Sequence, residues 1–155
     1  MITTVLPTAL TVSDLRRSLE FYCGLLGFRV AAEVPPPAER ARWDVYHERV
    51  CGIAGARINV VYLEASDGQT HLELIEYVRP KPETPPRRAI NEPGTAIVAL
   101  GVSGAEAEVR RLREAGVAIL SDPVPYRSDE GVQTTTTYLY DPDGNLLCLF
   151  ETVKN

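Results

Sequence analysis

The chain has 155 residues, of which 45% are hydrophobic and 24% charged, and its formal net charge is −5 at pH 7. This composition is typical of a folded globular domain and excludes a disordered chain, a collagen-like chain and a coiled coil. No apolar stretch approaches the roughly 20 residues of a membrane-spanning helix, so we expect no membrane partner. The chain also lacks a cationic cluster, which argues against a nucleic-acid partner because phosphate binding needs grouped Lys and Arg.

Cysteine usage and the start of the chain indicate a reducing compartment. The three cysteines, Cys23, Cys51 and Cys148, are widely spaced and include no Cys-x-x-Cys pair. Their odd number argues against a disulfide framework and a zinc knuckle. Residues 1–5 lack the basic segment of a signal peptide. We therefore expect a cytoplasmic protein.

In chain order, the first third predicts a strand, a helix and a second strand. Residues 2–12 alternate and are rich in β-forming types. Ser13 and Asp14 are suitable N-caps for a helix with leucines at helical spacing, and Gly27 is a natural end for it. Residues 28–34 predict the next strand, which stops at three consecutive prolines.

The region 94–121 repeats this plan. Residues 96–102 predict a strand, Ser103 is expected to cap a helix that ends at Gly116, and residues 117–120 predict the following strand. This internal repeat indicates a duplicated module.

Two hairpins repeat as well. Residues 62–68 match residues 138–144, and both contain an Asp-Gly turn, which is typical of a tight hairpin. Each hairpin leads into a further strand, at 72–76 and at 147–151.

Together these elements predict a single α+β domain, 1–155, made of two βαβββ modules in tandem. The modules span 1–77 and 94–151, and a stiff proline-rich linker is expected at 78–93. Side by side, they would form a curved mixed sheet with helices outside and a cleft inside. The first module is the longer one, and its additional residues fall within 31–56.

Strand alternation assigns side chains to the two faces of the expected sheet. Leu72 and Leu74 are expected to pack against a helix, so His71 and Glu73 would face the cleft.

The sequence resembles the vicinal oxygen chelate superfamily. Residues 11–22 (TVSDLRRSLEFY) and 25–28 (LLGF) resemble its opening, and residues 141–145 (DPDGN) resemble its closing hairpin. The superfamily includes glyoxalase I, methylmalonyl-CoA epimerase, extradiol dioxygenases, and the fosfomycin and bleomycin resistance proteins. The resemblance spans essentially the whole chain. Because many members dimerise, it implies a homodimer.

The resemblance also locates the positions at which metal-using members place their four ligands, usually His, Glu or Gln, His and Glu. Carried over, these positions fall on Pro7, Glu73, Ile97 and Cys148. Pro7 and Ile97 have no donor atom, and one thiolate with one carboxylate makes a poor site. We therefore expect no metal ligands and no cofactor. A shift of register is the alternative, and it would bring His71 into a metal site.

Three residues are candidates for catalysis. Glu73, a carboxylate in a cleft without a metal, is a candidate general acid or base. The alternative is an inert carboxylate paired with Arg or Tyr side chains. His71 could move protons or bind an anionic group, or simply be a half-exposed residue at a strand end. Tyr138, or its counterpart Tyr62, could stabilise a developing oxyanion.

Other aromatic and polar residues of the expected cleft are candidates for ligand contacts. The segment 41–49 is expected to form a short helix or a lid, with a surface helix as the alternative, and the segment 126–131 is expected to be a mobile loop. Rings and hydroxyls in one cleft suit a small oxygenated organic ligand. The candidates are Tyr62, Trp43, Tyr46, His47, Thr134, Thr136, Tyr126, Arg127, Cys148, Phe150, Ile97 and Pro7.

Two classes of function fit these features. The first is a metal-independent enzyme that moves a proton on a small oxygenated metabolite, as an isomerase, epimerase, dehydratase or cyclase does, in secondary metabolism. The second is a non-catalytic small-molecule or antibiotic-binding protein, similar to the bleomycin resistance proteins. A metal-dependent lyase or epimerase is a third possibility.

Overall fold

The computed structural model describes residues 1–83 and 89–153. The chain divides into two compact units, Met1–Pro85 and Pro86–Asn155, which are described separately below. In the described part of the chain, no helix has the length and hydrophobicity that a membrane crossing requires.

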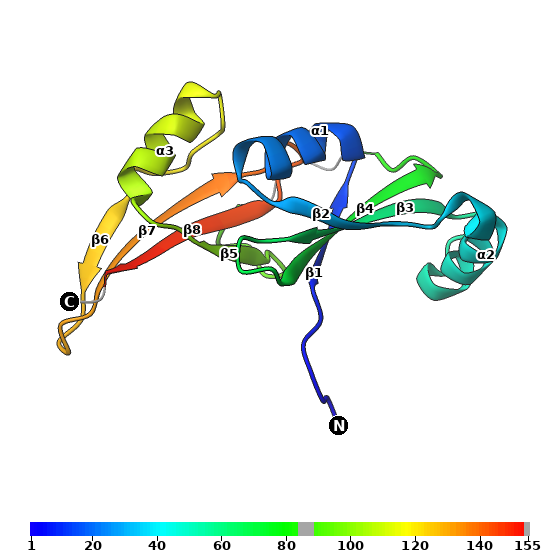
Figure 1. Cartoon of the computed structure of the whole chain (residues 1–155), viewed down its shortest axis with the longest axis horizontal. Helices are drawn as coiled ribbons and strands as arrows, with labels where there is room; N and C mark the ends of the chain where they lie inside the picture. The colour runs from blue at the N-terminus through cyan, green and yellow to red at the C-terminus, as the bar shows by residue number, and fades with distance from the viewer. Residues whose placement is uncertain (84–88, 154–155) are drawn as a thin grey trace. The chain divides into compact units, whose positions relative to one another are not determined.

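The first unit is a four-stranded mixed sheet with helices. The strand order is β1-β4-β3-β2, and β1 runs parallel to β4 while the other pairs are antiparallel. In Figure 1, α1 lies across one face of this sheet, and α2 lies at the end of β2 and β3. The elements are β1 (Thr8–Val12), α1 (Leu15–Leu19), the π-helical turn η1 (Glu20–Leu25), β2 (Arg29–Val34), the short 3₁₀ turn η2 (Pro37–Glu39), α2 (Arg40–Cys51), β3 (Arg57–Glu64) and β4 (Thr70–Arg79).

The second unit repeats this topology. Its order is β5-β8-β7-β6, with β5 parallel to β8 and the remaining pairs antiparallel. The α+β fold of tandem modules is therefore confirmed. The elements are β5 (Ile97–Gly101), α3 (Ala105–Glu114), β6 (Val124–Arg127), β7 (Gln133–Tyr140) and β8 (Leu146–Val153).

The strand registers of the two units match residue by residue. Tyr62 on β3 is opposite Glu73 on β4, and Tyr138 on β7 is opposite Cys148 on β8. The parallel pairs agree, because Ala9 is opposite Glu73 just as Ala99 is opposite Cys148. The internal repeat seen in the sequence is thus a repeat of register.

Buried leucine pairs on one face of each sheet form much of the hydrophobic core, and the other face adds Ile58 and Val60 in the first unit and Leu146 and Cys148 in the second. Leu63 is opposite Leu72, both are essentially fully buried, and Tyr22 of η1 is buried as well. In the second unit, Leu139 and Leu147 form the equivalent buried pair. Each such side chain stabilises the fold by about 1.5–3 kcal/mol.

The first helix begins where the sequence predicts but changes its winding. The Asp14 carboxylate accepts the Arg17 N–H at 3.1 Å, which confirms the predicted cap. After Leu19 the helix continues as η1, in which the Leu26 N–H donates to the Phe21 carbonyl at 3.0 Å. Gly27 then adopts a φ of +78°, as a helix end requires.

Three predicted boundaries need correction. β1 begins at Thr8, so residues 2–7 lie outside the strand, and Pro7 has no N–H to donate to a ladder. Residues 117–120 form only an isolated bridge beside β7. β4 continues through Arg79, so the first two residues of the expected linker 78–93 belong to the sheet.

The rest of the expected linker is only partly described. Residues 84–88 lie outside the described residues. Beyond them the backbone turns, because Glu92 N–H donates to the Ala89 carbonyl and Thr95 N–H to the Glu92 carbonyl, each at 3.1 Å. Residues 89–95 therefore form turns, whereas the sequence predicts an extended linker.

The N-terminus of α3 is capped by a distant carboxylate, and the predicted cap at Ser103 is wrong. Gly104 is the N-cap residue, with a φ of +73°. Its N–H and that of Ala105 donate to the Glu151 carboxylate on β8, at 2.5 and 3.0 Å. These backbone hydrogen bonds hold the pKa of Glu151 below its usual value. The contact fixes α3 to its sheet.

Replacing Glu151 with Gln is expected to destabilise the second unit, because the amide keeps the shape but loses the charge at a helix N-terminus. A carboxyl group with a lowered folded-state pKa stabilises the fold above its unfolded-state pKa, and this contribution is lost as the pH falls through the folded-state value. Thermal unfolding followed by circular dichroism should show a midpoint a few degrees lower at neutral pH. The difference should vanish in acid.

The matched control is Glu130→Gln, which alters an exposed carboxylate in the β6–β7 turn. Equal midpoints for the two variants at neutral pH would contradict the capping role of Glu151.

Candidate functional site

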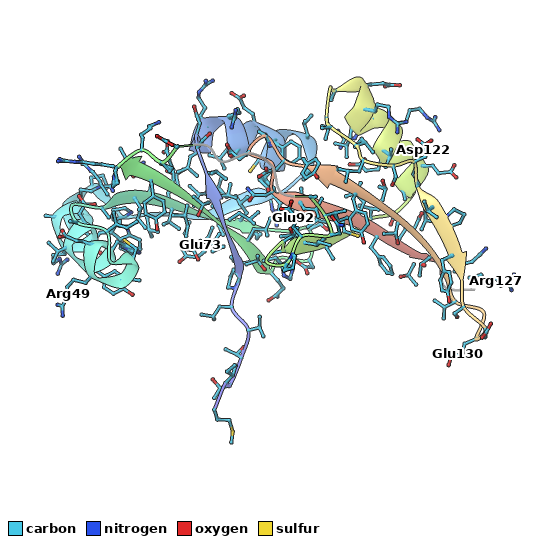
Figure 2. The ribbon with its side chains drawn as sticks, turned by 180° about the vertical axis from the view of Figure 1, so that it is seen from behind. Arg49, Glu73, Glu92, Asp122, Arg127 and Glu130 are labelled. Carbon is cyan, nitrogen blue, oxygen red and sulfur yellow. The ribbon has the colours of Figure 1, made fainter. Side chains whose placement is uncertain are left out.

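A carboxylate and a phenol on neighbouring strands form the centre of the candidate site. Glu73 and Tyr62 are directly opposite each other and both are half-buried. Their neighbours Leu72 and Leu63 are buried on the other face of the sheet, as strand alternation requires. The Tyr62 hydroxyl lies close enough to the Glu73 carboxylate for the two groups to interact. Glu73 is labelled on the first sheet in Figure 2.

The electrostatics of this pair favour a phenol that keeps its proton. Burial raises the pKa of Tyr62, and the nearby Glu73 carboxylate and Tyr46 raise it further. Tyr62 therefore acts as a hydrogen-bond donor at neutral pH. We call Glu73, Tyr62 and Tyr46 the Glu73 cluster.

Tyr46 reaches this cluster because polar contacts fix α2 beside β3. The Arg40 guanidinium donates to the Ile58 carbonyl at 2.7 Å, and Asp44 forms an ion pair with Arg57 at 3.5 Å. At the other end of α2, Cys51 lies close enough to Tyr77 of β4 to add to the rise in the pKa of that phenol, of which burial is the main cause. Tyr77 lies on the same face of the sheet as Glu73, since both occupy odd-numbered positions of β4.

The segment 41–49 therefore forms part of a helix, and its three aromatic residues stack on one another. The ring centroids of Trp43 and His47 are 4.3 Å apart, and those of Tyr46 and His47 are 4.8 Å apart. His47 Nδ1 also lies 3.1 Å from the Trp43 carbonyl. Tyr46 lines two shallow grooves, of about 450 and 540 Å³, and Trp43 lines the smaller of them.

His71 is held by the hairpin turn that precedes it. Its Nε2 is 2.8 Å from the Asp67 carboxylate, which also accepts the Gln69 N–H at 2.9 Å. The hydrogen bond with His71 is the main cause of the lowered pKa of Asp67. His71 is exposed, and Asp67 was not among the predicted residues. A signal for it exists in the sequence, because an Asp in an Asp-Gly turn commonly bonds to residues just after it.

The equivalent face of the second sheet carries hydroxyls, a ring and a thiol. Tyr138 is opposite Cys148, and Thr136 is opposite Phe150. Thr134 lies two residues before Thr136 on the same strand, and the three hydroxyl-bearing residues are half-buried. Cys148 is buried, and burial raises the pKa of its thiol. Ile97, at the start of β5, is exposed.

Tyr126 and Arg127 lie in a strand, which corrects the prediction of a mobile loop at 126–131. Both belong to β6, opposite Thr134 and Gln133. The turn is confined to 128–132, where the Ser128 N–H donates to the Val132 carbonyl at 2.9 Å. Both side chains are exposed, and Figure 2 shows Arg127 and Glu130 near the tip of this hairpin.

Comparison with known proteins identifies the family. The family model of the Glyoxalase/Bleomycin resistance protein/Dioxygenase superfamily matches residues 4–149. The chain belongs to this superfamily. A search of the curated proteins finds no match.

Solved structures of the superfamily share the fold at low sequence identity. A glyoxalase family protein from Bacillus cereus has a TM-score of 0.78 and 19% identity, and the match covers 98% of this chain and 97% of that one. Glyoxalase I of Leishmania major has a TM-score of 0.61 and 22% identity over 97% of this chain and 87% of its own. A glyoxalase family protein from Enterococcus faecalis has a TM-score of 0.61 and 23% identity, over 96% and 97%.

The residues at the four positions of the superfamily metal ligands do not fit a divalent cation. Pro7 and Ile97 carry no donor, and the Cys148 thiol is buried with a raised pKa, which opposes formation of the thiolate that a metal binds. Glu73 is engaged with Tyr62. Within the described residues of either unit, no three His, Cys, Asp or Glu side chains are grouped as a metal site.

Replacing Glu73 with Gln should lower the pKa of Tyr62, because the nearby negative charge is removed. The value should stay above that of an ordinary tyrosine, since burial is the larger cause. The measurement is a pH titration of ¹³Cζ-labelled tyrosines by NMR, with Tyr62→Phe used to assign the signal. Glu33→Gln is the control, because Glu33 is exposed and pairs with Val61, on the other face of the sheet. An unchanged Tyr62 titration in Glu73→Gln would contradict the proximity of the two groups.

Proposed function

We propose that this protein is an enzyme that moves a proton on a small oxygenated organic molecule, with the first unit carrying the reaction. The placement of Glu73 directly opposite Tyr62 on neighbouring strands, close enough for its charge to raise the pKa of the phenol, is the observation that supports this proposal. The Glu73 carboxylate is a proton acceptor, and the Tyr62 phenol is a donor beside it. Base and donor together are what proton abstraction next to a carbonyl needs.

In the proposed reaction, Glu73 removes a proton from the carbon next to a carbonyl group. The electron pair of the broken C–H bond moves to the carbonyl oxygen, where the Tyr62 hydroxyl stabilises the negative charge. Return of the proton from the Glu73 carboxyl group to the same carbon or to a neighbouring one gives epimerisation or isomerisation. Alternatively, the enolate electron pair expels a hydroxyl group from the adjacent carbon, and the proton held on Glu73 combines with it to form water, which gives dehydration.

Supporting roles follow from the positions of the other candidates. His71 is proposed as a secondary proton carrier, held by Asp67. Tyr138 occupies the position equivalent to Tyr62 but is opposite Cys148, so its side of the repeat lacks a carboxylate. Tyr138 therefore has no base opposite it, and Tyr138, Thr134 and Thr136 stay predicted ligand contacts of the second unit alone, with no role in proton transfer. The homodimer, the cytoplasmic location and the role in secondary metabolism stay predictions.

Replacing Glu73 with Gln should reduce catalysed proton exchange by about 10²–10⁴-fold, the usual contribution of a general base. The measurement is ¹H NMR in D₂O with a panel of 2-hydroxy ketones, 3-oxo thioesters and aryl ketones, following loss of the C–H signal. Glu33→Gln is the matched control on the same sheet. The proposed function fails if Glu73→Gln exchanges as fast as the control.

The alternative is a non-catalytic binding protein, which the aromatic stack on α2, with its exposed Tyr46, also suits. The same panel separates the two functions when binding is measured by calorimetry. An enzyme should exchange protons on a bound compound and lose exchange, but not binding, in Glu73→Gln. Binding without exchange by the wild-type protein would support the alternative.

The proposal also predicts independence from metal. Protein purified without chelator should contain transition metals at well below one equivalent per chain, because the donor set is unsuited to them. The measurement is inductively coupled plasma mass spectrometry, combined with the exchange assay before and after treatment with a chelator. Near one equivalent of zinc, nickel, manganese or iron, together with loss of exchange on chelation, would contradict the proposal.

A further inference from the structure

One side of α2 presents an unusual combination of rings, branched aliphatic groups and cations to solvent. Arg42, Tyr46 and Arg49 are spaced by four and three residues, so they follow one side of the helix. Val45 and Val50 lie beside them, each 62% exposed, and the five residues line the groove of about 540 Å³. We call this surface the α2 stripe. Exposed apolar groups gathered in one place often mark a binding surface.

The two arginines of the stripe are available to an anion. Arg49 forms no ion pair with any residue that the structure describes, and Figure 2 shows it at α2, pointing away from the sheet. Arg42 has one distant partner, Glu39 at 3.9 Å, and its side chain is 82% exposed. By contrast, Arg40 on the same helix is engaged with the Ile58 carbonyl and the Asn59 side chain.

Tyr46 connects the stripe to the Glu73 cluster. It lines both grooves, and it lies close enough to Tyr62 to raise the pKa of that phenol. Trp43 lines the smaller groove, and its indole Nε1 is buried without a hydrogen-bond partner among the described residues. Glu73 and Tyr62 line neither groove, so a ligand in the grooves would meet the Glu73 cluster at Tyr46, the member of the cluster that lines both.

We propose that the substrate is an aromatic or fused-ring compound that carries a carboxylate. This inference rests on the proposed function of Glu73 and names the substrate class of the same site. The ring system lies on Tyr46 and Trp43, and the carboxylate is bound by Arg42 and Arg49. Guanidinium groups suit this ligand because they bind carboxylates through paired hydrogen bonds and also attract the faces of aromatic rings.

The test compares 2-naphthoate with 2-naphthamide, which share the ring system but differ in charge. Wild-type protein should bind 2-naphthoate about tenfold more tightly than 2-naphthamide at low salt, as expected for a charge-assisted hydrogen bond. The double variant Arg42→Gln/Arg49→Gln should lose this preference, and salt should reduce it in the wild type. Tyr46→Leu should weaken the binding of both compounds to the same extent. Calorimetry gives the dissociation constants.

The matched control is Arg110→Gln, which removes an exposed arginine from α3. The inference is overturned if the two compounds bind equally, or if the double variant keeps the wild-type preference. Sedimentation velocity tests whether a second copy of the chain, instead of a ligand, binds to the α2 stripe. If the double variant changes the oligomeric mass but not the ligand preference, the stripe is an interface between copies and the inference is wrong.

Failure of this inference can be distinguished from failure of the proposed function. Glu73→Gln should still bind 2-naphthoate with the wild-type preference, since it leaves the stripe intact. If Glu73→Gln loses proton exchange but the arginine double variant keeps the preference for 2-naphthoate, only the proposed substrate class is overturned. An arginine-dependent preference together with normal exchange in Glu73→Gln would overturn only the proposed catalysis.

Discussion

The register between β3 and β4 is the constraint on which the rest of the first unit depends. It places Leu63 opposite Leu72 on one face and Tyr62 opposite Glu73 on the other. A slip of one residue would move a carboxylate into the core and leucines into the site. Burial of the leucine face resists this slip, because an unpaired charge in a core is costly. The same contacts that stabilise the fold therefore hold the Glu73 cluster in place.

Features encoded by nearby residues could be predicted from the sequence. Short-range patterns predict the Asp14 cap, the end of the helix at Gly27 and the face of the sheet on which each strand residue lies. The cap of α3 could not be predicted in this way, because Glu151 lies on a strand 46 residues away from Ala105. Strand β6 was missed as well, since Pro125 interrupts a short run that is defined by its partner β7.

The candidate site shows the same division. Alternation along β4 was enough to place Glu73 on the open face, and the repeat indicated Tyr62 as a counterpart of Tyr138. The position of Tyr46 could not be predicted from the sequence. Helix α2 has no buried residue, so its sequence has no apolar face that would indicate which side packs against the sheet. Its place is fixed by contacts of Arg40 and Asp44 with β3. The turn contact of Asp67 with His71 depends on side-chain geometry that spacing alone does not give.

The matched registers of the two units have a consequence for how such a chain can change over generations. Within each copy of the repeat, the buried leucine pairs lie on one face of the sheet, and the candidate site residues lie on the other. A substitution at a half-buried position of the second face disturbs the core less than one at the buried leucines, and duplication allows one copy to diverge while its twin retains the original groups. The carboxylate opposite Tyr62 and the thiol opposite Tyr138 are two outcomes of that freedom on a common scaffold.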